Sequence, residues 1–82
     1  MLTYNLHHVN GLYFQLLDDG GKNREYEVSF YDRQSKETIY KTKMTKGAWV
    51  RLSRKYLSDI AIIIRFEGRT IEQINFLDRI KG

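Results

Sequence analysis

The chain has 82 residues, 41% of them hydrophobic, a formal net charge of +4 at neutral pH and no cysteine. This length predicts a single domain, residues 1–82, with enough aromatic and aliphatic side chains to fold rather than stay disordered. The lack of cysteine excludes disulfides and thiolate metal sites and suits a reducing compartment, so we expect a cytoplasmic protein. The longest apolar run, residues 60–64, is too short for a membrane span.

Turn signals and alternating side chains divide the first half of the chain. Asn10-Gly11 is typical of a type I′ hairpin turn, because both residues tolerate a positive φ. Further on, Tyr26, Val28 and Phe30 alternate with polar residues, which is typical of a strand with one buried face. The predicted strands of this half lie around residues 4–9, 12–17, 25–32 and 37–45.

The second half begins after a break at Lys46-Gly47. Residues 49–64 carry apolar side chains at spacings of three and four, which would also suit an amphipathic helix. The β-branched, alternating run 60–66 favours a strand, an irregular turn and a second strand instead. The predicted strands of this half lie around residues 48–52, 60–66 and 70–77.

These elements predict an all-β fold, a small antiparallel β-sandwich or partly open barrel of about six to seven strands. The chain contains no proline, so Lys and Glu side chains would have to discourage pairing at the sheet edges.

Residues that could carry catalysis or bind a metal are sparse. His7 and His8 are adjacent, and on a strand they would point to opposite faces, which disfavours a shared metal. Asp18 and Asp19 are next to each other in a loop, whereas paired catalytic carboxylates must flank a substrate across a cleft. We therefore expect neither an enzyme in this chain alone nor a metal or other cofactor.

A basic stretch with an embedded tryptophan is the most conspicuous feature of the sequence. Residues 41–56 contain no acidic residue, and they hold Trp49 and Tyr56. Such a stretch can bind single-stranded nucleic acid, with Trp49, Tyr56 and Tyr40 stacking on bases. We favour the alternative that Trp49 and Tyr56 are structural anchors of the core. The basic side chains of this stretch that form a candidate docking face are Lys43, Arg51, Arg54 and Lys55.

The order of several segments resembles a known domain. A VNG turn is followed by YEVSFYD, KETIYKT, a tryptophan, SRKY, an isoleucine-rich strand and a D-x-x-KG ending. This order resembles the N-terminal β-domain of bacterial glycosyltransferases such as the autotransporter strand-loop-strand O-heptosyltransferases. One departure is the segment SDIAIII, where that family usually has a second tryptophan.

The resemblance implies a non-catalytic β module of a glycosyltransferase-like protein, with catalysis in domains that would follow residue 82. Such a module would support oligomerisation or position the acceptor protein or glycan, so its partners would be protein, another copy of itself or glycan. Two alternatives remain: a free-standing barrel that binds single-stranded nucleic acid, and a carbohydrate-binding module. The second would use Tyr13, Tyr31 or Tyr40 as stacking platforms.

Overall fold

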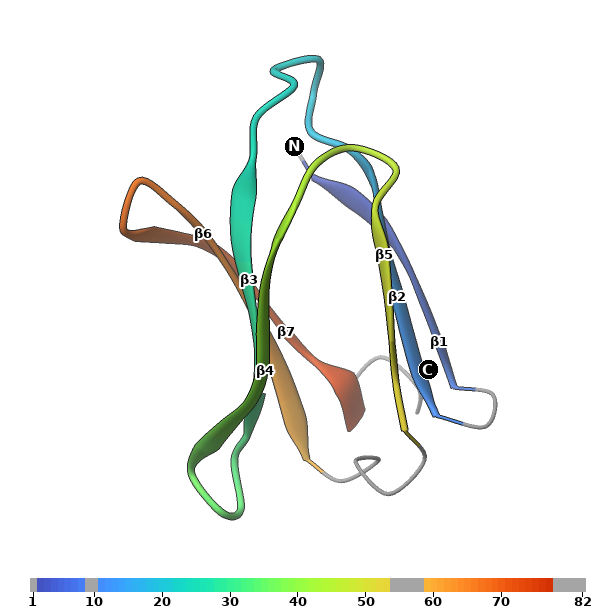
Figure 1. The fold of residues 1–82 in the computed structure, drawn as a ribbon, viewed down its shortest axis with the longest axis vertical. Helices are drawn as coiled ribbons and strands as arrows, with labels where there is room; N and C mark the ends of the chain where they lie inside the picture. The colour runs from blue at the N-terminus through green and yellow to red at the C-terminus, as the bar shows by residue number, and fades with distance from the viewer. Residues whose placement is uncertain (1, 9–10, 54–58, 78–82) are drawn as a thin grey trace.

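The computed structural model describes residues 2–8, 11–53 and 59–77, which form an all-β domain. Its strands pair antiparallel in two sheets that face each other and do not close into a barrel (Figure 1). Sheet A has the strand order β1-β2-β5, and sheet B has the order β4-β3-β6-β7. The strands are β1 (Thr3–His8), β2 (Leu12–Asp18), β3 (Tyr26–Asp32), β4 (Glu37–Met44), β5 (Trp49–Leu52), β6 (Ile60–Phe66) and β7 (Arg69–Asn75).

Period-2 alternation decides which side chains face the other sheet. In β3, Val28 and Phe30 are fully buried, and they pair with Ile64 and Ile62 of β6. Because successive strand residues point to opposite faces, the four side chains lie together on the inner face. The strand pattern predicted from the sequence, and with it the sandwich, is confirmed.

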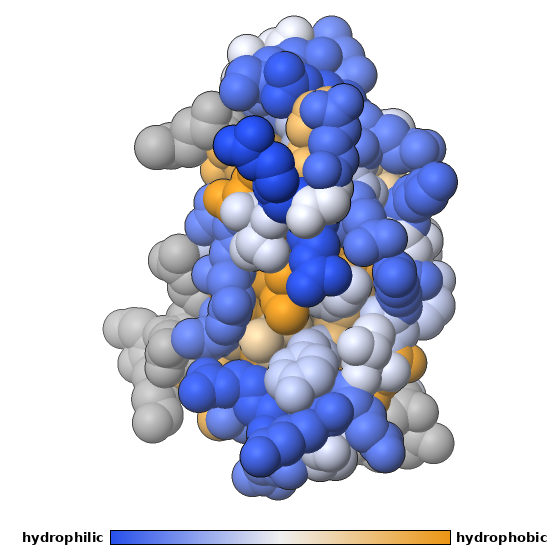
Figure 2. Space-filling model, turned by 90° about the vertical axis from the view of Figure 1, so that its left-hand side faces the viewer, coloured by the Kyte–Doolittle hydropathy of each residue, from blue (hydrophilic) through white to orange (hydrophobic). Residues whose placement is uncertain are grey.

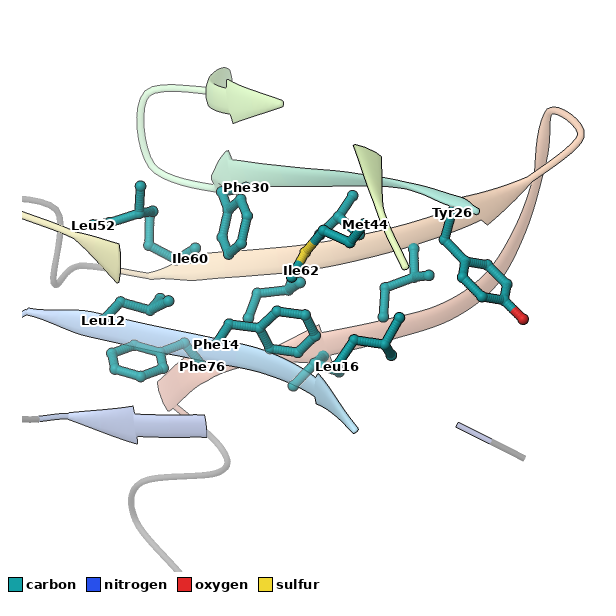
Figure 3. Packing of buried hydrophobic residues seen from close by; sticks show 13 residues of the cluster. Leu12, Phe14, Leu16, Tyr26, Phe30, Met44, Leu52, Ile60, Ile62 and Phe76 are labelled. Atoms are coloured by element: carbon teal, nitrogen blue, oxygen red, sulfur yellow. The ribbon is translucent and has the colours of Figure 1, made fainter. Parts of the chain in front are cut away.

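The core fills the space between the two inner faces (Figure 3). Phe14 of β2 meets Phe30 of β3 across this space, with ring centroids 6.1 Å apart and the planes at 77°. Such an edge-to-face pair is favourable beyond its buried area. The other buried hydrophobic residues of the core cluster are Leu12, Leu16, Tyr26, Val28, Met44, Leu52, Ile60, Ile62, Ile64, Ile74 and Phe76.

The connections of the β6–β7 and β1–β2 hairpins differ in length. At Glu67-Gly68 both residues have positive φ, 51° and 78°, and Phe66 pairs with Arg69, which is typical of a two-residue type I′ turn. Of the predicted Asn10-Gly11 turn, Asn10 lies outside the described residues, and Gly11 has a φ of +134°. However, His8 pairs with Leu12, so three residues separate the paired positions where a type I′ turn would leave two.

The segment that also suited a helix contains strands at both ends. β5 covers its beginning and β6 its end, while residues 54–58 lie outside the described part of the chain. The two predicted strands are therefore confirmed, whereas the predicted turn between them falls mainly on residues outside the described part of the chain. The last strand ends at Asn75, two residues before the predicted end.

Candidate functional site

Three aromatic rings, one from each strand of sheet A, form a row on the outer face of that sheet. The ring of His7 in β1 lies 5.7 Å from that of Tyr13 in β2, with the planes 29° apart. The Tyr13 ring lies 5.9 Å from that of Trp49 in β5, with the planes 26° apart. We call His7, Tyr13 and Trp49 the aromatic row.

The strand register and one polar side chain build this row. His7 lies directly opposite Tyr13, whereas Trp49 lies opposite Gln15, the next outward residue of β2. The Tyr13 hydroxyl donates a 3.4 Å hydrogen bond to Gln15 Oε1, so the phenol ring leans along β2 toward the position of Trp49. A large ring can reach its diagonal neighbour across a sheet, and the Tyr13–Trp49 contact is such a diagonal pair.

Gln15 also holds the connection that leads into β5. Its Nε2 donates a 3.2 Å hydrogen bond to the carbonyl oxygen of Gly47, and the N–H of Gly47 donates to the carbonyl oxygen of Leu16. Gly47 has a φ of +90°, a conformation that side chains rarely adopt. The chain therefore enters β5 in a position that is fixed relative to β2.

The prediction that Trp49 anchors the core is wrong, because 60% of its surface is exposed. Val50 and Leu52 occupy the inner face of β5, where they pair with Phe14 and Leu12 of β2. Trp49 is one residue out of phase with both of them, so alternation turns its indole outward. The indole makes an offset stacking contact with the ring of Tyr13 in β2, and β5 is an edge strand, so the side of the indole away from Tyr13 lies toward the open edge of sheet A.

Unpaired positive charge lies next to the aromatic row. Arg51 is exposed and directly opposite Tyr13, and Lys46 is exposed in the connection before β5. Neither has an ion-pair partner among the residues that the structure describes. Asp18, at the end of β2, is the one acidic residue in the three strands of sheet A. This face is therefore cationic as well as aromatic.

The tertiary structure separates the basic stretch onto the two sheets. Lys43 lies on the outer face of sheet B, and Arg51 on the outer face of sheet A, so the fold does not bring these two members of the candidate docking face together. Tyr56, Arg54 and Lys55 lie outside the described residues.

Three cations on the outer face of sheet B are paired with carboxylates. Lys41 Nζ lies 3.4 Å from Glu27 Oε2, and Lys43 Nζ lies 4.0 Å from Glu25 Oε1. Arg65 Nη1 lies 3.9 Å from Glu27 Oε1. Exposed pairs such as these add little stability, but they reduce the net charge of this face. Lys46 and Arg51, next to the aromatic row, lack the carboxylate partners that these three cations have.

The outer face of sheet B has a different character. Figure 2 shows this side as a hydrophilic surface with a narrow hydrophobic strip at its middle. On the outer face of sheet B, Ile63, which is half-buried, lies opposite Ser29, and Ala61 lies opposite Tyr31. A nearby hollow of about 280 Å³ is lined by charges of both signs, among them Glu25, Glu27, Lys43, Arg65 and Glu67. Neither positive nor negative charge predominates around this hollow.

Tyr13, Tyr31 and Tyr40, the predicted sugar platforms, lie on separate surfaces. Tyr31 is on the outer face of sheet B. Tyr40 lies opposite Phe30 at the edge strand β4, with ring centroids 6.1 Å apart. Of the three, only Tyr13 belongs to the aromatic row. Tyr40 also makes its ring contact with Phe30 of sheet B, whereas Trp49 makes its ring contact with Tyr13 of sheet A.

Asp19 has a structural task. Its carboxylate accepts hydrogen bonds from the N–H groups of Asn23 and Arg24, at 2.9 and 2.8 Å, and from the Tyr26 hydroxyl at 2.9 Å. These bonds, the one from the Arg24 N–H foremost, lower the pKa of Asp19 to about 2. Burial, together with the charge and hydrogen bond of Asp19, raises the pKa of Tyr26. Asp19 thus closes the β2–β3 loop onto the start of β3.

The two histidines point to opposite faces, as predicted. His7 stacks on Tyr13 on the outer face, whereas the ring of His8 lies 5.8 Å from that of Phe76. Within residues 2–8, 11–53 and 59–77, no group of three or more histidine and carboxylate side chains could hold a metal ion. In the same part of the chain, no helix is long and apolar enough to cross a membrane.

The sequence pattern indicated only part of this surface. Trp49 and Arg51 could be singled out from the sequence by their residue types. The roles of His7 and Gln15 on this face could not be predicted, because they depend on strand register. Comparison of the chain with models of protein families, with curated proteins and with solved structures finds no match. The resemblance to the glycosyltransferase β-domain, and the role implied by it, therefore stay predictions.

Proposed function

We propose that the protein is a binding module for single-stranded nucleic acid, and that the ligand stacks on the aromatic row. The observation that supports this most directly is the exposed, stacked arrangement of His7, Tyr13 and Trp49 on one sheet face. Proteins that bind single strands combine aromatic platforms for the bases with positive charge for the backbone, and this face carries both.

The position of Trp49 suits a base that continues the stack. Tyr13 makes an offset stacking contact with the indole, and the side of the indole away from Tyr13 lies toward the open edge of sheet A. A base placed there would extend the row by one ring. Arg51 follows Trp49 by two residues on the same face of β5, and Lys46 precedes it by three. Phosphates on either side of that base could therefore meet a positive charge.

Charge favours nucleic acid over neutral glycan as the ligand. Sugar rings also stack on tryptophan and tyrosine, and their hydroxyl groups are commonly bound by carboxylates and amides. The outer face of sheet A offers the amides of Asn5 and Gln15, but its charged side chain is Arg51. An unpaired arginine and an unpaired lysine beside the row complement a phosphate backbone.

A labelled single-stranded oligonucleotide tests this proposal by fluorescence anisotropy at two salt concentrations. Trp49→Ala should weaken binding by about 1–3 kcal/mol, the usual value of one stacked base, which is roughly 5- to 150-fold in Kd. Arg51→Ala and Lys46→Ala should each lower the slope of log Kd against log salt by about one, if each contacts one phosphate. The fluorescence of Trp49, the only tryptophan, should change on binding to the unmodified protein.

Matched variants on the other sheet serve as controls. Lys41→Ala removes a cation that is paired with Glu27, and Tyr40→Ala removes an exposed aromatic ring that belongs to sheet B and contacts Phe30. Both should leave the affinity unchanged. Failure to bind the oligonucleotide at low salt, or equal losses with Tyr40→Ala and Trp49→Ala, would refute the proposal. Binding to a glycan array but not to oligonucleotides would reassign the face to carbohydrate.

A further inference from the structure

The open edge of β5 presents unused main-chain groups next to the proposed stacking site. The N–H of Leu16 donates a 3.0 Å hydrogen bond to the carbonyl oxygen of Ala48, so the main chain of Ala48 faces β2. Hydrogen-bonded and non-hydrogen-bonded pairs alternate along an antiparallel ladder. Val50 and Leu52 therefore also direct their N–H and C=O groups to β2, whereas Trp49 and Arg51 direct theirs away from it.

Nothing in the described part of the chain occupies that edge. β5 is the last strand of sheet A, and apart from the strand ladders no described residue makes a main-chain hydrogen bond with Trp49 or Arg51. Each of these two residues thus offers one donor and one acceptor side by side, in the plane of the sheet. Backbone groups of this kind form hydrogen bonds wherever a partner is available.

A base stacked on the free face of Trp49 would lie beside these groups. Every nucleobase carries adjacent donor and acceptor groups on its edge, and a strand residue offers the complementary pair. We propose that the main-chain N–H and C=O groups of Trp49 and Arg51 hydrogen-bond the edge of the base stacked on Trp49. The open edge of β5 would thereby favour a nucleobase over a stacking ring that lacks such a donor and acceptor edge. This inference rests on the proposed function and adds a source of specificity to it.

Proline separates the main-chain contact from the side-chain contact at position 51. Arg51→Ala removes the positive charge and keeps the N–H, whereas Arg51→Pro removes both. Proline is tolerated on an edge strand where its nitrogen faces outward, and the register places Arg51 in that orientation. Arg51→Pro should bind the oligonucleotide about fivefold more weakly than Arg51→Ala, the typical value of one hydrogen bond. Circular dichroism checks that both variants are folded.

A modified ligand tests the same contact with the unmodified protein. An oligonucleotide of unsubstituted purine keeps the stacking ring of adenine but lacks the exocyclic amino donor. It should bind about fivefold more weakly than the adenine oligonucleotide. Equal affinity for the two oligonucleotides, or equal affinity of Arg51→Pro and Arg51→Ala, would overturn the inference. If Trp49→Ala weakens binding in the same series, the proposed function stands even then, so the two failures are distinguishable.

Discussion

Trp49→Ala should destabilise the domain only modestly, although tryptophan is the largest side chain in the protein. A core anchor would cost about 3–5 kcal/mol on truncation to alanine. Because 60% of the surface of Trp49 is exposed, only about two fifths of that free-energy loss is expected for its truncation. The truncation also leaves no closed cavity, because the side chain lies at the surface. The expected decrease in the free energy of unfolding is about 1–2 kcal/mol, most of it from the contact with Tyr13.

Phe14→Ala is the matched comparison from the inner face of the same sheet. Phe14 is fully buried and contacts the rings of Tyr4 and Phe30. Its truncation should cost about 3–5 kcal/mol. A domain of 82 residues has a typical total stability of about 4–12 kcal/mol, so this variant should lose much of its stability.

Urea denaturation followed by circular dichroism at 25 °C measures both values. The unmodified protein should also show native-state acrylamide quenching of Trp49 close to that of its unfolded chain. The reasoning would be refuted if Trp49→Ala lost as much stability as Phe14→Ala, or if native Trp49 were protected from acrylamide. If Phe14→Ala fails to fold while Trp49→Ala folds, the result would also support a larger loss of stability for Phe14→Ala than for Trp49→Ala.

Two further predictions concern turns. Asp19 has a folded-state pKa of about 2, below its usual 3.8, so its stabilising effect is complete above pH 4 and disappears as the pH falls toward 2. Asp19→Asn should lower the thermal midpoint at pH 7 and flatten the dependence of stability on pH between 4 and 2; an unchanged acid profile would contradict this assignment. Gly68→Ala should cost more than about 1 kcal/mol in urea unfolding, because φ is +78°, with Gly68→Asn milder.

Local patterns in the sequence were sufficient for the strands. The alternation of Tyr26, Val28 and Phe30, and that of Ile60, Ile62 and Ile64, predicts strands whose buried faces the structure confirms. These predictions succeeded because the period of a strand is a property of the backbone, and a buried face needs a continuous set of apolar side chains.

The aromatic row depended on information that no single segment contains. A two-residue turn at Asn10-Gly11 would have paired His8 with Tyr13, whereas the structure pairs His7 with Tyr13. A shift of one residue exchanges the two faces of a strand, so it decides which histidine joins the row. The residue type of Trp49 favoured a place in the core. However, Val50 pairs with the core residue Phe14, so Val50 faces the core and its neighbour Trp49 faces outward.

The sequence by itself determined that the chain is all-β and that a basic stretch surrounds its only tryptophan. Only the tertiary structure decided which of these basic side chains are paired with carboxylates and which are not. Pairing of β4 with β3 places Lys41 and Lys43 beside carboxylates on sheet B, whereas pairing of β5 with β2 leaves Arg51 next to Tyr13. Charge neutralisation depends on neighbours in space, and in a sandwich those neighbours come from strands far apart in the chain.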